Sequence, residues 1–172
     1  DDLIKALLNK LQTKQNPEFI ESIESIADSV DDIGPIFGDI FNAMIQLLQA
    51  CDDQAVQYKI FDCILALVHY SSKRARHFFQ QISEVCFQVL SSGEENTQFV
   101  PSAIKILSFL IESSPKLFAQ HVETFLQLVI QNLNSDDLQI LTASIMGYGH
   151  LIDNYSEQLE SSISSVLPKL QE

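Results

Sequence analysis

Histidine and cysteine side chains are the best candidates for chemistry in this sequence, and their spacing matches no catalytic or metal-binding pattern. The sequence has no H-E-x-x-H pair, no G-x-S-x-G nucleophile turn and no G-x-x-x-x-G-K-[ST] phosphate loop. The cysteines lie 12 and 23 residues apart without a C-x-x-C pair, so metal-ligand spacing is absent. We therefore predict that the protein is not an enzyme and holds no cofactor or metal. The histidines and cysteines in question are His69, His77, His121, His150, Cys51, Cys63 and Cys86.

The cysteines and one glycine pair have structural interpretations. We expect the cysteines to be small buried residues in a reducing compartment. Gly147-Tyr148-Gly149 lies within an expected helix rather than after a strand, so it does not match a dinucleotide fingerprint. We expect these two glycines to let neighbouring helices approach closely.

Acidic side chains are the next candidates for function. The 172 residues include 23 Asp and Glu against 10 Lys and Arg, a formal charge of −13. That balance argues against direct nucleic-acid binding, which depends on Lys and Arg, and 46% hydrophobic residues argue against disorder. Three acidic pairs recur at equivalent turns and would form a ridge for a basic peptide or protein; the alternative is that they cap helix N-termini. The pairs are Asp52 and Asp53, Glu94 and Glu95, and Asp136 and Asp137.

Lys73, Arg74 and Arg76 form the only basic cluster. They follow an expected helix C-terminus, where cations complement the helix dipole. Dipole complementation and solubility are one interpretation, and a docking site for an acidic partner is the other.

A repeat of about 40 residues organises the chain. Anchors at Phe37, Phe78, Phe118 and Leu159 are spaced 41, 40 and 41 residues apart. Apolar residues recur four, seven and eleven residues after each anchor. Fourteen residues before each anchor stands an isoleucine, at Ile23, Ile64, Ile104 and Ile145. A shared helical period alone does not keep this phase over four units.

The periodicity predicts an all-α chain of helix pairs. We expect first helices at 3–14, 36–50, 77–92, 117–134 and 158–171, and second helices at 17–30, 53–71, 96–113 and 136–154. Asp53, Asn96 and Asp136 are expected to cap second helices. The fold class is a right-handed α-solenoid of about four helix hairpins and about nine helices. The chain is one segment with units at 1–35, 36–76, 77–116, 117–157 and a partial 158–172. Apolar repeat positions at both ends indicate a fragment of a longer superhelix.

Repeat register also identifies three aromatic misfits. Phe79, Phe87 and Phe109 stand where sister repeats carry mostly small or polar residues. They would either form an exposed apolar patch for a partner or fill irregularities between repeats. Apolar stretches such as 104–111 are far shorter than the about 20 residues that span a bilayer, so we expect no membrane insertion.

Two segments resemble HEAT repeats of the importin-β (karyopherin-β) family of nuclear transport receptors. They are 33–37, Ile-Gly-Pro-Ile-Phe, with the apolar residues that follow, and 151–159 running on to 166–170. The resemblance implies an acidic superhelix in the cytoplasm and nucleus that binds basic cargo on the second helices and is emptied by Ran GTPase. It also implies that phenylalanine–glycine nucleoporins bind between first helices, with Phe79 and Phe87 as groove candidates. The alternative is another HEAT scaffold: a phosphatase regulatory subunit, a tubulin-binding array or a vesicle-coat adaptor.

Overall fold

The computed structural model describes residues 36–166 together with Ala6, Asn9, Glu18, 20–23 and Ser25. Side chains of 94–95 and 160–166 are not among those described. Most of the expected helices at 3–14 and 17–30 and the end of 158–171 lie outside the described residues. Within the described part every regular element is helical, which confirms the all-α class. The chain divides into two compact units, Asp1–Ala75 and Arg76–Glu172.

The first unit contains a helical hairpin of α3 (Phe37–Ala50) and α4 (Gln54–Tyr70), followed by the short α5 (Ser72–Ala75). Asp53 ends the turn between the two long helices, because its carboxylate accepts hydrogen bonds from the amides of Ala55 at 2.8 Å and Val56 at 3.4 Å. This confirms Asp53 as an N-cap. The apolar stripes of the two helices are buried together: Phe37, Ile40, Phe41, Met44, Leu47, Ile60, Ile64, Leu67 and Val68.

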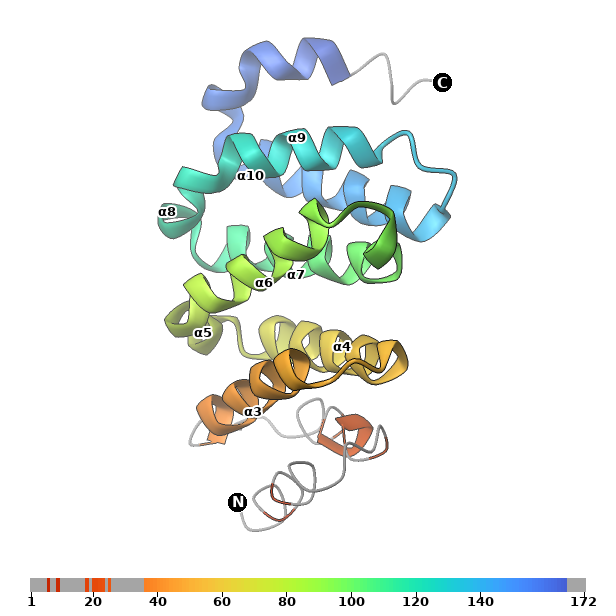
Figure 1. The fold of residues 1–172 in the computed structure, drawn as a ribbon. Helices are drawn as coiled ribbons and strands as arrows, with labels where there is room; N and C mark the ends of the chain where they lie inside the picture. The colour runs from red at the N-terminus through yellow and green to blue at the C-terminus, as the bar shows by residue number, and fades with distance from the viewer. Residues whose placement is uncertain are drawn as a thin grey trace. The chain divides into compact units, whose positions relative to one another are not determined.

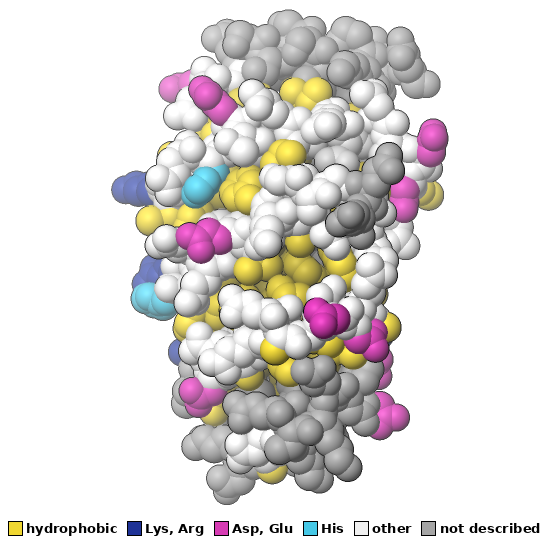
Figure 2. Space-filling model, in the orientation of Figure 1, with side chains coloured by type: hydrophobic (Ala, Val, Ile, Leu, Met, Phe, Trp, Pro, Cys, Tyr) yellow, Lys and Arg dark blue, Asp and Glu magenta, His cyan; other side chains and the backbone are white. Residues whose placement is uncertain are grey.

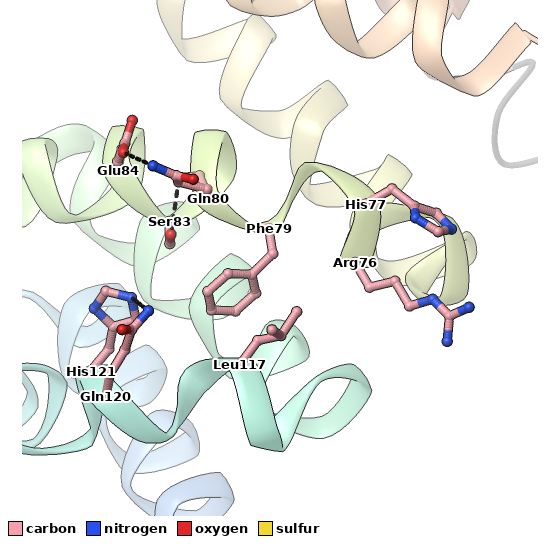
Figure 3. Close-up of a pocket in the computed structure, with 9 residues that line it drawn as sticks. All are labelled: Arg76, His77, Phe79, Gln80, Ser83, Glu84, Leu117, Gln120 and His121. Carbon is pink, nitrogen blue, oxygen red and sulfur yellow. Dashed lines mark hydrogen bonds between the residues drawn. The ribbon is translucent and has the colours of Figure 1, made fainter.

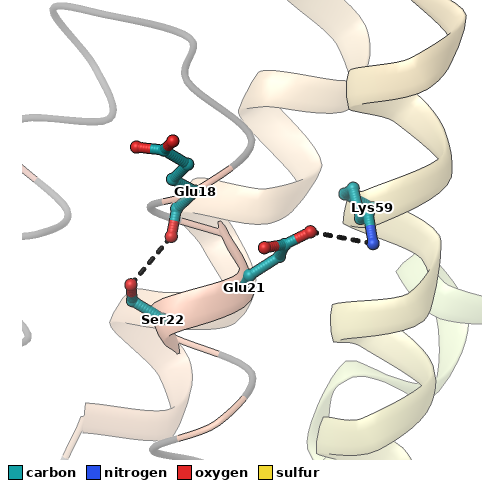
Figure 4. Close-up of polar contacts among 4 residues, drawn as sticks. All are labelled: Glu18, Glu21, Ser22 and Lys59. Carbon is teal, nitrogen blue, oxygen red and sulfur yellow. Dashed lines mark hydrogen bonds and ion pairs between the residues drawn. The ribbon is translucent and has the colours of Figure 1, made fainter.

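A short helical stretch at 20–23 lies beside α4 in the same unit (Figure 4). Lys59 Nζ is 2.9 Å from Glu21 Oε1, and the Ser22 hydroxyl donates to the Glu18 carbonyl at 2.7 Å. Ile20 and Ile23 are fully buried, so this stretch presents apolar residues inward and Glu21 toward α4.

The second unit consists of two helical hairpins (Figure 1). The first pairs α6 (Phe79–Ser91) with α7 (Val100–Ser113), and the second pairs α9 (Val122–Asn132) with α10 (Leu138–Val166). Short helical turns join them: η2 (Arg76–Phe78), η3 (Gly93–Phe99), α8 (Pro115–Phe118) and η4 (Ala119–His121). The hairpins stack, because α10 packs along α7 and aromatic rings of α6 contact rings of α8 and α9.

Helix α10 has a kink at Tyr155. Two helices were expected at 136–154 and 158–171, and α10 consists of two helical stretches on either side of a kink at Tyr155, whose backbone is non-helical (φ −137°, ψ 28°). The Tyr155 hydroxyl donates to the Pro115 carbonyl, which ties the bend to the start of α8. The helices of the described part run from α3 to α10 with short helical turns between them, and their count differs from the about nine expected for the whole chain.

Two expected caps are also corrected. Asn96 is non-helical and donates its amide to the Ser92 hydroxyl at 2.9 Å, while α7 begins later, after Phe99, without a side-chain cap. At α10 the capping carboxylate belongs to Asp137 rather than Asp136. It accepts from the amides of Gln139 at 2.7 Å and Ile140 at 3.4 Å.

The two helix glycines of α10 differ. A Cβ at Gly147 would lie 3.1 Å from Ile104 Cγ2, 3.2 Å from Phe125 Cζ and 3.3 Å from Val129 Cγ2, so α10 approaches both α7 and α9 here. A Cβ at Gly149 would meet nothing within 4 Å. The close-approach prediction is therefore confirmed for Gly147 and wrong for Gly149.

Candidate functional site

A recess of about 460 Å³ on the second unit is the best candidate site in the described part of the chain. It lies between α6 and the α8–η4 turn, where one hairpin stacks on the next (Figure 3). Phe79 and Leu117 face each other across it and form its apolar surface; Phe79 is 6% exposed and Leu117 is 50% exposed. Its lining residues are Arg76, His77, Phe79, Gln80, Ser83, Glu84, Leu117, Gln120 and His121.

A cluster of aromatic rings supports this recess. The Phe79 ring packs edge-on against Phe118 with centroids 6.2 Å apart, and Phe118 packs edge-on against Phe125 at 5.5 Å. The Phe87 ring lies 5.2 Å from that of His121. Burial lowers the pKa of His121, because the charged imidazolium loses hydration against these rings. The floor is therefore packed and apolar, and His121 is held in its neutral form at neutral pH.

Several polar groups that line the recess already form hydrogen bonds. The Gln80 amide donates to Glu84 Oε1 at 3.0 Å, and the Ser83 hydroxyl donates to the Gln80 carbonyl at 3.0 Å. Gln120 Nε2 is 3.2 Å from His121 Nε2. The Ser83 hydroxyl and the Glu84 carboxylate are thus engaged with Gln80. Amide groups around an apolar recess suit a peptide that inserts one apolar side chain and hydrogen-bonds through its backbone.

The three aromatic misfits have different positions. Phe79 and Phe87 both contact the ring cluster under the recess, where they fill the space between stacked hairpins. Phe79 is buried and Phe87 is half-buried. Phe109 lies elsewhere, with its ring 6.4 Å from that of His150, where α7 meets α10. The structure therefore brings two of the three together and separates the third.

The acidic pairs are exposed wherever their side chains are described. Asp53 caps α4 and Asp137 caps α10. No hydrogen bond of the described residues involves the carboxylate of the neighbouring Asp52 or Asp136. Glu94 and Glu95 lie in η3, and their side chains are outside the described set. On the face shown in Figure 2, the acidic side chains are scattered and many of them lie toward its edges. Capping accounts for one carboxylate of each described pair.

The basic cluster is divided between the units. Lys73 and Arg74 are exposed on α5 of the first unit, and Arg76 is exposed on η2 of the second. Only Arg76 lines the recess, where its guanidinium points away from Phe79 in Figure 3.

Sequence reasoning did not identify Gln80, Ser83, Leu117, Gln120 or His121 as site residues. One signal was available for Leu117, because it stands directly before the anchor Phe118. Adjacent residues of a helix point in different directions, so an apolar residue beside a buried anchor can face the solvent. Phe118 is fully buried and Leu117 is half exposed, so Leu117 is such a residue.

The described residues offer neither a metal site nor a membrane-spanning helix. They contain no group of three or more His, Cys, Asp or Glu side chains that could hold a metal ion. None of the described helices is both long enough and apolar enough to cross a membrane. The three cysteines are buried, as expected, and form no disulfide with one another. Burial raises the pKa of the Cys86 thiol.

In comparisons with known proteins, no family model matches the chain and no curated protein matches it.

Proposed function

We propose that the chain is a protein–protein interaction scaffold, part of an importin-β-like nuclear transport receptor built as a right-handed α-solenoid of HEAT-like hairpins. The observation that carries this proposal is the stacking of two hairpins in the register of the 40-residue period. Ile104, at the invariant isoleucine position of one repeat, is covered by Gly147 of the next repeat. Helix hairpins stacked at a fixed period build solenoids, and solenoids present long surfaces to partners.

The recess between α6 and α8 is the proposed binding site for phenylalanine–glycine segments of nucleoporins. A phenylalanine ring would enter between Phe79 and Leu117, and the rim amides of Gln80 and Gln120 would hydrogen-bond the flexible peptide backbone. The volume of about 460 Å³ and the half-exposed Leu117 support this use. The charge of −13 supports a second class of partner, basic cargo, with Ran GTPase as its release factor and the cytoplasm and nucleus as its location.

Binding of a phenylalanine–glycine peptide to the purified chain tests the proposal. Leu117→Ser removes half of the apolar lining without unfolding a buried core, and Leu138→Ser is a matched control at a 74% exposed leucine outside the recess. Burying a leucine contributes about 1.5–3 kcal/mol, so we expect Leu117→Ser to weaken binding about tenfold and Leu138→Ser to leave it unchanged.

Two results would contradict this function. Equal binding of the peptide by both variants would exclude the recess as the peptide-binding site. A wild-type chain that binds neither this peptide nor a basic signal peptide at low salt would favour the alternative, a HEAT scaffold such as a phosphatase regulatory subunit, a tubulin-binding array or a vesicle-coat adaptor.

A further inference from the structure

One end of the recess between α6 and the α8–η4 turn carries a positive charge. Arg76 and His77 line this end. In Figure 3 they lie on one side of Phe79, and Glu84 lies on the other. Arg76 stands three residues before Phe79, a spacing at which residues of a helix are neighbours on its surface. The Arg76 guanidinium therefore stands beside the apolar surface of the recess without covering it, since it points away from Phe79.

Two basic side chains at or beside the recess have no partner among the described residues. Arg76 is exposed, and Lys116, which precedes Leu117 on α8, is exposed as well. Neither side chain forms an ion pair or a hydrogen bond within the described part of the chain, whereas Lys59 is paired with Glu21. A guanidinium in this state is a ready partner for a carboxylate, because its planar donors match the geometry of the two carboxylate oxygens.

The other ionisable groups of the recess do not neutralise this end. Glu84 is the one carboxylate among the described residues that line the recess, and its Oε1 accepts a hydrogen bond from the Gln80 amide at 3.0 Å. His121 adds no charge at neutral pH, because burial lowers the pKa of its imidazole. The recess thus has a cationic end at Arg76 and an amide-rich end at Gln80 and Gln120, where Glu84 lies.

We propose that the recess selects acidic peptides, in which an Asp or Glu flanks the inserted apolar residue, and that Arg76 is the specificity-determining residue. The apolar side chain lies between Phe79 and Leu117, and the carboxylate of the ligand pairs with the Arg76 guanidinium. Lys116 raises the positive potential on the α8 side. This inference rests on the proposed binding of phenylalanine–glycine segments in the recess and adds which of those segments are selected.

The net charge of the chain predicts the opposite preference. At −13, the whole chain should attract basic peptides and repel acidic ones. At about 0.15 M salt, exposed charges farther apart than about 8 Å are largely screened from one another, so a carboxylate seated beside Arg76 interacts mainly with that residue. A preference for acidic peptides at this salt concentration therefore comes from the local geometry of the recess and opposes the overall charge.

Short peptides of equal length test the proposal. Asp-Gly-Phe-Gly-Ser and Ser-Gly-Phe-Gly-Asp cover both directions in which the peptide backbone can run along the recess, and each is compared with counterparts in which Asn or Lys replaces Asp. Fluorescence anisotropy with the full chain at about 0.15 M salt measures their affinities. We expect at least one Asp peptide to bind about two- to fivefold more tightly than its Asn counterpart, the range for an exposed ion pair. The Lys counterpart should bind more weakly than the Asn peptide.

Two substitutions at one residue and a matched control assign the preference. Arg76→Gln should equalise binding of the Asp and Asn peptides, and Arg76→Glu should reverse their order. Lys105→Gln, on α7 outside the recess, removes the same charge from the chain and should leave the two- to fivefold ratio in place. Urea midpoints of the variants verify that each is folded.

The inference is overturned if the Asn or Lys peptides bind as tightly as both Asp peptides, if Arg76→Gln keeps the ratio, or if Lys105→Gln abolishes it. Self-association of the chain that Arg76→Gln abolishes would identify a second copy as the occupant and would overturn it as well. Binding that depends on Leu117 but shows no preference for Asp contradicts only the selectivity and leaves the proposed function standing. If no peptide binds, both proposals fail.

Discussion

Substitution of the two glycines of α10 by alanine should have opposite effects on stability. Gly147 and Gly149 lie two residues apart in the same helix, so the intrinsic benefit of alanine is the same at both, about 1 kcal/mol. At Gly149 nothing lies within 4 Å of the new methyl group. We therefore expect Gly149→Ala to stabilise the second unit by about 0.5–1 kcal/mol.

At Gly147 the same methyl group would meet three side chains at 3.1–3.3 Å. All three, Ile104, Phe125 and Val129, are 0% exposed and belong to a packed core, so they have little freedom to move. Overpacking of this kind costs about 1–3 kcal/mol. After the helix-propensity gain of about 1 kcal/mol is subtracted, Gly147→Ala should destabilise the unit by about 0–2 kcal/mol.

Urea unfolding followed by circular dichroism measures both effects, because the midpoint moves with the free energy of unfolding when the slope is unchanged. The quantity of interest is the difference between the two variants, which should be at least about 1 kcal/mol. A Gly147→Val variant adds bulk at the same site and should destabilise the unit further. If Gly147→Ala and Gly149→Ala have equal midpoints, the close approach of α10 to α7 and α9 does not exist and our reasoning is refuted.

Two further predictions concern a cap and a titrating ring. Asp53→Ala should lower the free energy of unfolding by about 1 kcal/mol, because two amides of α4 lose their acceptor. Asp52→Ala is the control and should change the free energy of unfolding little. Urea midpoints of both variants measure the effect, and equal losses would contradict the capping role of Asp53. Since burial lowers the pKa of His121 below 6.5, the unfolded chain takes up a proton more readily than the folded chain. The contribution of His121 to the free energy of unfolding should therefore be constant above pH 6.5. It should fall as the pH drops from 6.5 toward the lowered pKa of the folded state. His121→Gln should remove that part of the decline in urea midpoints measured between neutral and mildly acidic pH, and an unchanged pH dependence would show that another group is responsible.

The helices were predictable from the sequence because their signals are local. Apolar residues at three- and four-residue spacing identified the helices observed as α3, α4, α6, α7 and α9, and Asp53 identified the start of α4. The boundaries were less predictable. Pro115 begins a separate short helix, and Asn96 donates a hydrogen bond to Ser92 instead of capping α7. The residue at which each of these helices begins depends on contacts with neighbouring elements.

The candidate recess was only partly predictable. Repeat register identified Phe79 and Phe87 as residues out of pattern, and both lie at the recess or under it. Leu117, Gln120 and His121 come from the following repeat, about 40 residues later, and no local pattern relates them to α6. Their proximity depends on how one hairpin is seated on the next.

The sequence by itself determined that this protein is all-α, acidic and repetitive, because helical periodicity, charge and period are properties of residues in order. Only the tertiary structure decided which equivalent residues are buried and which are exposed. Ile104 and Ile145 occupy the same repeat position, yet one is fully buried under α10 and the other is 49% exposed. Gly147 and Gly149 are likewise the same residue type in one helix, but only Gly147 faces a neighbour. The physical reason is that burial depends on the presence of a packing partner, and a residue's own identity does not supply one.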